Sequence, residues 1–279
     1  MKTLRSVLAT QRFCLSAPKP IVLVPTMGAL HAGHVSLLKR ARKLAGSSGT
    51  VVTSVFVNPT QFGPTEDLSR YPRPFKKDQA LCRASGVDVV FAPSPAEMYA
   101  PDSSVWVDES QVSQRLCGAS RPGHFRGVCT VVLKLFQICQ PTVAVFGQKD
   151  FQQCAVIQRM VRDLNVPVRL VFAPTVRESD GLALSSRNVY LSPEERAQAT
   201  VLSESLKEAR ASFLAGETNV KSLQRRITKH ILSAPLAKVD YIEIVNGSTL
   251  FPVPKLEKGT VIALAVLFGK TRLIDNIRL

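Results

Sequence analysis

Two histidines lie three residues apart in the stretch PTMGALHAGH, residues 25–34. The stretch directly follows an apolar run at residues 21–24, and apolar residues at helical spacing begin again at Val35. A helix that begins there offers backbone N–H groups and the positive end of its dipole to a phosphate. Gly28 and Gly33 allow the backbone to come close, and imidazoles can donate hydrogen bonds to phosphate oxygens. The stretch therefore predicts a phosphate-binding corner between a strand and a helix.

A second corner of the same kind follows the apolar run at residues 142–146, where Gly147-Gln148-Lys149-Asp150 leads into another helical pattern. Lys149 adds a mobile positive charge. Lys149, His31 and His34 together predict a site for a nucleotide in which a phosphate gains negative charge while it undergoes displacement. The structural alternative is that the two histidines are a helix cap and a packing residue. The glycine-rich context and the position after a strand favour the chemical interpretation.

The elements that must position these corners are strands and helices in alternation. Five apolar runs rich in Val and Ile alternate with amphipathic segments up to about residue 172, a pattern typical of a parallel sheet covered on both faces. We therefore predict an α/β fold: a doubly wound, Rossmann-like domain over residues 1–174 and a smaller α+β domain over residues 175–279. In the second domain we expect a helix from Ser192 to about residue 215. Ligands of such sheets bind beyond the carboxyl ends of the strands, where both corners lie.

The composition narrows the class of protein. A formal charge of +15 is compatible with nucleic acid, an anionic membrane surface or anionic small substrates, but the basic residues are spread through amphipathic segments. The six cysteines show neither a C-x-x-C pair nor metal spacing, as expected of thiols in an intracellular protein. No apolar stretch is long enough to span a bilayer, and no secretory signal is recognisable.

Two motifs carry a resemblance to a known superfamily. HAGH at residues 31–34 resembles the H-x-G-H signature of nucleotidyltransferases, and LSSRN at residues 184–188 resembles their mobile phosphate loop, about 150 residues further on. A more detailed resemblance is to the pantothenate synthetase (pantoate-β-alanine ligase) family. Its blocks are PTMGALHAGH, FVNPTQF, EDLSRYPR, RPGHFRGV, KLFQICQPTVAVFGQKDFQQ and DGLALSSRNVYL, in order from residue 25 to 191, with GKTRLIDNI near the end.

The resemblance implies an ATP-dependent ligation in two steps. Pantoate carboxylate attacks the α-phosphate of ATP, giving pantoyl adenylate and pyrophosphate. The amine of β-alanine then attacks the acyl carbon and releases AMP and pantothenate. The resemblance further implies a need for Mg²⁺, a cytoplasmic homodimer formed through the first domain, a second domain acting as a lid, and neither nucleic acid nor membrane as partner.

The resemblance also assigns residues. As catalytic groups it implies His34, described in the family as the proton donor, with His31, Lys149 and Arg187. The implied ATP-binding residues are Pro25, Thr26, Met27, Gly28, His31, Gly33, His34, Gly147, Gln148, Lys149, Asp150, Val176, Leu184, Ser185, Ser186 and Arg187. Pantoate is assigned to Met27, Gln61 and Gln153, with Phe62 beside its methyl groups, and β-alanine to Gln61, Arg121 and His124.

Two assignments keep alternatives. Asp78 matches an acid near the family's magnesium, but Lys77 stands where some members have another acid, and Asp150 is a competing candidate. Arg121 and His124 can hold a substrate carboxylate or simply anchor their loop. Residues 63–66 are interpreted as a flexible gate loop.

Two other functions are compatible with parts of the sequence. Another H-x-G-H nucleotidyltransferase would transfer its nucleotide and stop, whereas RPGHFRGV together with Gln61 and Gln153 favours a ligase with a second nucleophile. An RNA-binding module is suggested only by the net charge.

Overall fold

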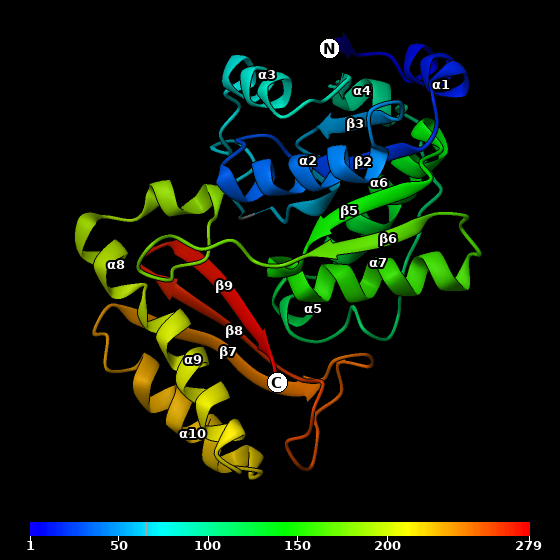
Figure 1. Ribbon diagram of the computed structural model, residues 1–279. Helices are drawn as coiled ribbons and strands as arrows, with labels where there is room; N and C mark the ends of the chain where they lie inside the picture. Colours follow the sequence, from blue (N-terminus) through cyan, green and yellow to red (C-terminus); the bar gives the residue numbers. More distant parts are fainter. Residues whose placement is uncertain (65) are drawn as a thin grey trace. The chain divides into compact units, whose positions relative to one another are not determined.

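Figure 1 shows the computed structural model, which describes residues 1–64 and 66–279. Thr65, in the predicted gate loop, lies outside the described residues. The strands are β1 Lys2–Leu4, β2 Ile21–Thr26, β3 Thr50–Val55, β4 Val89–Phe91, β5 Val143–Gly147, β6 Arg169–Ala173, β7 Ala237–Asn246, β8 Thr260–Phe268 and β9 Thr271–Arg278.

Helices occupy most of the segments between the strands. The α-helices are α1 Val7–Ser16, α2 Ala32–Ala45, α3 Phe75–Ala84, α4 Pro95–Met98, α5 Cys117–Ser120, α6 His124–Cys139, α7 Phe151–Asp163, α8 Pro193–Gln198, α9 Val201–Leu214 and α10 Val220–Ile231. Short 3₁₀ turns are η1 Pro59–Gln61, η2 Gln148–Asp150 and η3 Ser186–Tyr190.

The chain divides into two compact units. The first comprises Met1–Ser110, Arg121–Gln148 and Gln153–Pro174, and the second comprises Gln111–Ser120, Lys149–Gln152 and Thr175–Leu279. Two short segments that precede residue 175 in the sequence therefore belong to the second unit. Throughout the described residues, no helix is both long and apolar enough to cross a membrane.

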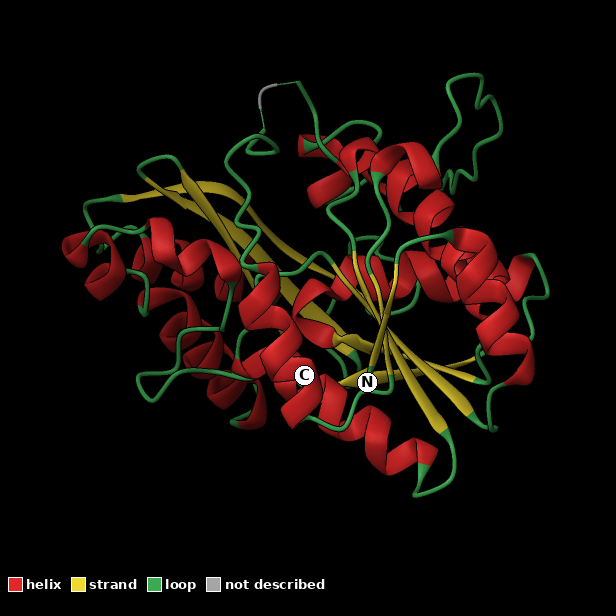
Figure 2. Ribbon diagram, turned by 90° about the horizontal axis from the view of Figure 1, so that it is seen from above, coloured by secondary structure: helices red, strands yellow, loops and turns green. Residues whose placement is uncertain are grey.

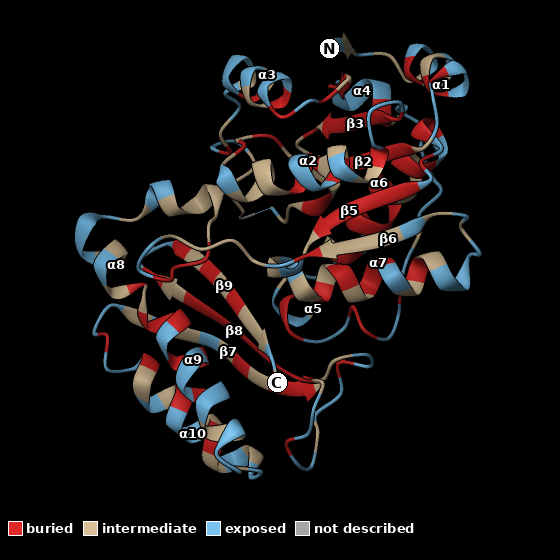
Figure 3. Ribbon diagram, in the orientation of Figure 1, coloured by how far each residue is buried: buried red, intermediate tan, exposed pale blue. Residues whose placement is uncertain are grey.

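The first unit is built on a six-stranded sheet with the order β1-β4-β3-β2-β5-β6, in which every neighbouring pair is parallel. This confirms the predicted doubly wound fold. The central strands consist almost wholly of buried residues, as Figure 3 shows for β2, β3 and β5. Edge strand β1 was not predicted, because three residues are too few for a pattern to be read.

Helices cover both faces of this sheet (Figure 2). α2 and α3 contact each other and connect strands that run toward β1, whereas α1 and α6 contact each other and connect strands in the other direction. Right-handed crossovers place these two pairs on opposite faces.

The direction of winding reverses at β2, which pairs with β3 on one side and with β5 on the other. The carboxyl ends of β2 and β5 are therefore neighbours at the topological switch point, where ligands of doubly wound sheets bind. The two predicted phosphate-binding corners directly follow these strands.

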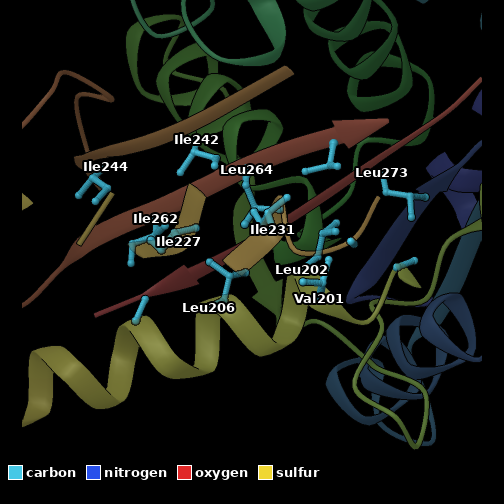
Figure 4. Close-up of a cluster of buried hydrophobic side chains, with 14 of the residues drawn as sticks. Val201, Leu202, Leu206, Ile227, Ile231, Ile242, Ile244, Ile262, Leu264 and Leu273 are labelled. Atoms are coloured by element: carbon cyan, nitrogen blue, oxygen red, sulfur yellow. The ribbon is translucent and has the colours of Figure 1, made fainter. Parts of the chain in front are cut away.

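The second unit contains a three-stranded antiparallel sheet in the order β7-β8-β9. α9 and α10 pack against it, and Figure 4 shows Leu206 and Ile227 of these helices among isoleucines and leucines of the strands. The single helix predicted from Ser192 is two helices. Leu202 N–H bonds to the carbonyl of Ala199 at 3.3 Å, so a tight turn separates α8 from α9.

Candidate active site

Both histidines of HAGH cap the helix that follows them. His31 is the N-cap of α2, and its Nδ1 accepts the backbone N–H of Gly33 at 3.1 Å. Nδ1 of His34 accepts the backbone N–H of His31 at 3.4 Å, which completes a capping box made of two imidazoles. The ring centroids are 4.1 Å apart. The helix cap that is the structural alternative for these histidines is therefore present.

The cap uses only Nδ1 of each ring. A backbone N–H can only donate, so Nδ1 of His31 and of His34 carries a lone pair in this arrangement. The ring proton of the neutral imidazole is then on Nε2. Both rings hold an Nε2–H donor at the amino terminus of α2, which is the group that a phosphate oxygen requires.

Asp78 of α3 anchors the loop that leads into this cap. Its Oδ2 accepts the N–H of Ala29 at 3.0 Å and its Oδ1 accepts that of Leu30 at 2.8 Å, and the residue is 1% exposed. Burial raises the pKa of Asp78, against the lowering effect of the two backbone hydrogen bonds. Gly28 has a φ of +81°, and a Cβ there would lie 3.0 Å from Oδ2 of Asp78, so a side chain at residue 28 would press on the anchor.

These contacts bear on the predicted metal site. Each oxygen of Asp78 accepts a hydrogen bond from the loop backbone, and its burial separates it from solvent. Within residues 1–64 and 66–279, no three His, Cys, Asp or Glu side chains gather in a way that could hold a metal ion. The donor set around Asp78 fits a structural anchor and does not fit a protein-built Mg²⁺ site, for which several oxygen ligands are needed.

Gln61 is held by a buried amide that sequence reasoning missed. Asn58 is 1% exposed and donates from Nδ2 to Oε1 of Gln61 at 2.9 Å. Its own Oδ1 accepts from the hydroxyls of Tyr99 and Thr60, at 2.9 and 3.0 Å. Because Oε1 of Gln61 is oriented in this way, its Nε2 is the group that can donate to a ligand.

Gly127 brings α6 against the turn that carries Gln61. A Cβ at this position would lie 2.3 Å from the carbonyl oxygen of Thr60, a distance that no side chain tolerates. The carbonyl of Gly127 also accepts from Nδ2 of Asn58 at 3.2 Å. Gly127, the second of the two glycines in RPGHFRGV, thus permits the contact between η1 and α6 that positions the amide of Gln61.

Arg121 and His124, at the start of α6, converge on the same turn. Nη2 of Arg121 donates to the carbonyl of Gln61 at 3.2 Å, and His124 Nδ1 lies 2.8 Å from that oxygen. The guanidinium also forms an ion pair with Glu66. The first unit therefore brings Gln61, Arg121 and His124 together, and it also contains Gln153, a half-buried residue of α7.

Gly147 and Gln148 still belong to the first unit, and the second unit holds the predicted residues Lys149, Asp150, Val176 and 184–187. Lys149 and Asp150 lie in η2, where the carbonyl of Lys149 accepts Nδ2 of Asn276 from β9 at 2.9 Å. The sequence did not predict this contact, although Asn276 lies in the GKTRLIDNI segment that resembles the family. β9 thereby fixes the backbone of the lysine from a position more than one hundred residues later in the sequence.

The LSSRN segment forms a hairpin-like loop in this unit. The N–H of Leu184 bonds to the carbonyl of Val176 at 3.0 Å, and Ser185 Oγ accepts the N–H of Arg187 at 3.2 Å to cap η3. Arg177 holds the base of the loop with a bidentate pair to buried Asp275, at 2.6 and 2.8 Å. Hydrogen bonds to this carboxylate raise the pKa of Arg177, so its charge is permanent.

Comparisons with known proteins match nearly the full chain to one family. The model of the pantoate-β-alanine ligase family matches residues 1–278. The pantothenate synthetase of Thermotoga petrophila is 54% identical over 258 residues, which cover 92% of this chain and 91% of that protein. The crystal structure of pantothenate synthetase from Thermus thermophilus superposes with a TM-score of 0.94 at 45% identity, covering 100% of this chain and 99% of that one.

One further solved structure that matches this chain contains ligands. The pantoate-β-alanine ligase of Francisella tularensis was solved in complex with β-γ ATP and β-alanine. It matches with a TM-score of 0.82 at 35% identity, over 100% of this chain and 97% of that chain.

Proposed function

The chain belongs to the pantoate-β-alanine ligase family, and from that premise we propose that it condenses pantoate with β-alanine at the expense of ATP. One observation carries the proposal. The Francisella ligase, which was solved with an ATP compound and β-alanine bound, matches this chain over its whole length. The products are pantothenate, AMP and pyrophosphate.

In the first step, an oxygen of the pantoate carboxylate attacks the α-phosphorus of ATP, and pyrophosphate leaves. Negative charge grows on the phosphate oxygens as this happens. Nε2–H of His31 and His34, the N–H groups at the start of α2, and the ammonium of Lys149 stabilise that charge. Arg187 and the backbone of the LSSRN loop are proposed to hold the polyphosphate, and Val176 and Leu184 the nucleoside.

Pantoate is proposed to lie against the amides of Gln61 and Gln153, with Met27 and Phe62 beside its methyl groups. Its hydroxyls both donate and accept, and amides offer both functions. The fixed orientation of Gln61 supports this assignment, because a ligand meets a donor that is already in place.

In the second step, the amine of β-alanine attacks the acyl carbon of pantoyl adenylate, the amide bond forms, AMP leaves with the carboxylate oxygen, and the amine loses a proton. Arg121 is proposed to bind the carboxylate of β-alanine, with His124 beside it.

Mg²⁺ is proposed to enter with the nucleotide, whose phosphate oxygens supply ligands that the described part of the chain does not gather by itself. When bound, it would neutralise phosphate charge. Asp78 is proposed to act as the anchor of the HAGH loop, which is the role that its two backbone hydrogen bonds favour.

We also propose that the protein is a cytoplasmic homodimer, that the second domain, residues 175–279, acts as a lid, and that neither nucleic acid nor membrane is a partner. Light scattering at increasing protein concentration tests the dimer, and retention of RNA on nitrocellulose across a salt series tests the absence of a polynucleotide partner.

The proposed activity is tested with purified protein, ATP, Mg²⁺, pantoate and β-alanine. We expect AMP, pyrophosphate and pantothenate in equal amounts, and no AMP when pantoate is omitted. Release of AMP that is independent of both organic substrates, or a stable nucleotidyl conjugate as the final product, would contradict the assignment.

A further inference from the structure

The guanidinium of Arg121 already holds a carboxylate that belongs to the protein. Its Nε donates to Oε1 of Glu66 at 2.8 Å, and its Nη2 donates to Oε2 at 2.6 Å. The two side chains are 18% and 22% exposed, so solvent screens the pair only partly. This two-point geometry is the one in which arginine binds carboxylate ligands.

The remaining edge of the guanidinium contacts His124 of α6 through Nη1 and the carbonyl of Gln61 through Nη2. Nη1 of Arg121 lies 3.0 Å from Nε2 of His124, and Nδ1 of His124 lies 2.8 Å from the carbonyl oxygen of Gln61. A carbonyl only accepts and a guanidinium only donates, so the contacts require a neutral His124 that donates from Nδ1 and accepts at Nε2. His124 therefore orients Arg121 by hydrogen bonds to protein groups.

Both edges are thus engaged by described residues, and the edge formed by Nε and Nη2 is the only one whose partner is anionic. An incoming carboxylate can form the same two-point contact only after Glu66 has left. Exchange of one carboxylate for another keeps the charge of Arg121 neutralised throughout, whereas a neutral group would leave a partly buried cation without a counter-ion.

We propose that Glu66 is a specificity-determining residue: its carboxylate occupies the position of the nucleophile's carboxylate and is displaced by it. The inference rests on the proposed function, in which Arg121 binds β-alanine. An amine that lacks a carboxylate cannot displace Glu66, so the contact selects nucleophiles that carry a negative charge at the end opposite the amine.

The test compares wild-type protein with the Glu66→Gln variant, which keeps the size of the side chain and removes its charge. Loss of a partly exposed competing ion pair is worth roughly a threefold to tenfold change in affinity. We expect the KM for β-alanine to fall by about that factor. Pyrophosphate–ATP exchange with pantoate alone, which does not involve the nucleophile, stays within about twofold of wild type.

Two controls isolate the charge competition. Ethylamine, a nucleophile with no carboxylate, is expected to react with the same kcat/KM in wild type and Glu66→Gln. Asp163→Asn removes one negative charge at the exposed pair with Arg162 on α7, and it leaves the KM for β-alanine unchanged.

Other outcomes distinguish failure of the displacement proposal from failure of the proposed function. If wild-type protein makes pantothenate but Glu66→Gln has an unchanged or higher KM for β-alanine, the displacement proposal is wrong and the proposed function stands. If Glu66→Gln lowers exchange and the melting temperature together, Glu66 has only a structural role and the proposal is also wrong. If wild-type protein makes no pantothenate, the proposed function itself fails.

Discussion

Replacement of His31 separates its capping role from its proposed chemical role. His31→Ala removes the Nδ1 acceptor of the Gly33 N–H and also the Nε2 donor. His31→Asn removes the Nε2 donor but supplies a side-chain oxygen, and asparagine is among the most favourable N-cap residues. The two variants therefore differ in the cap and agree in the missing donor.

The cap contact at 3.1 Å sets the expected size of the stability effect. Loss of an N-cap side chain costs about 0.5–2 kcal/mol, so we expect His31→Ala to destabilise the protein by about 1 kcal/mol and to lower the melting temperature by roughly 2–4 °C. His31→Asn is expected to stay within a few tenths of a kcal/mol of wild type. The loss of one donor to a developing charge lowers a rate by about a hundredfold or more, so both variants should lose pantoate-dependent pyrophosphate–ATP exchange to the same extent.

The assays are thermal denaturation and pyrophosphate–ATP exchange on the same preparations. Ser6→Ala is a matched control, because Ser6 caps α1 by accepting the N–H of Ala9 and is assigned no part in the chemistry. It should lower stability without changing exchange. Near-normal exchange in His31→Asn would show that His31 is only a cap, and normal stability in His31→Ala would show that the cap is not formed.

Three further predictions concern residues of the first unit. In Asp78→Asn, one loop N–H faces an amide NH₂, so a hydrogen bond worth about 1.5–3 kcal/mol is lost. We expect calorimetry to give a lower melting temperature and steady-state kinetics to give a lower kcat. A more than tenfold rise in the Mg²⁺ concentration for half-maximal activity would instead identify Asp78 as a metal ligand. Burial raises the pKa of Cys82 and of Cys129 to about 12 from an ordinary value of 9.0, so their contribution to stability is complete below pH 9 and is lost as the pH rises toward 12. The urea midpoint of wild type should fall over that range more steeply than that of the Cys82→Ala/Cys129→Ala variant, and equal slopes would contradict the shifts. Tyr99→Phe removes a donor to the amide that orients Gln61, so the KM for pantoate should rise a few-fold while the KM for ATP is unchanged; parallel changes in both would argue against a specific role.

Periodicity predicted the first unit well because a parallel sheet buries both faces of its strands. Such strands read as continuous apolar runs, and β2, β3 and β5 are of this kind. The expectation that both corners lie beyond the carboxyl ends of strands followed from the same alternation, whereas their position at the switch point depends on the strand order, which only the structure gives. The single helix predicted after Ser192 was wrong, because the turn at Ala199 contains neither proline nor glycine and so leaves no mark in the sequence.

The contacts that hold the candidate site in place could not be predicted from the sequence, because they join side chains that lie far apart along the chain. The anchor between Asp78 and the loop at Ala29 joins residues 49 positions apart, and Asn276 reaches Lys149 across 127 positions. Spacing rules detect neighbours along a helix or strand and cannot detect such pairs. The one available sign was chemical. Asn58 lies shortly after the end of β3, and a buried asparagine must satisfy its amide with specific partners.

Transfer of oxygen from pantoate to AMP tests the central claim most directly. Pantoate labelled with ¹⁸O in its carboxylate is converted in the presence of ATP, Mg²⁺ and β-alanine, and the AMP is analysed by mass spectrometry. Attack of the carboxylate on the α-phosphorus predicts AMP that carries one ¹⁸O atom. Unlabelled AMP, with the label found instead in pyrophosphate as attack on the β-phosphorus would give, would contradict an acyl adenylate and with it the role proposed for His31, His34 and Lys149.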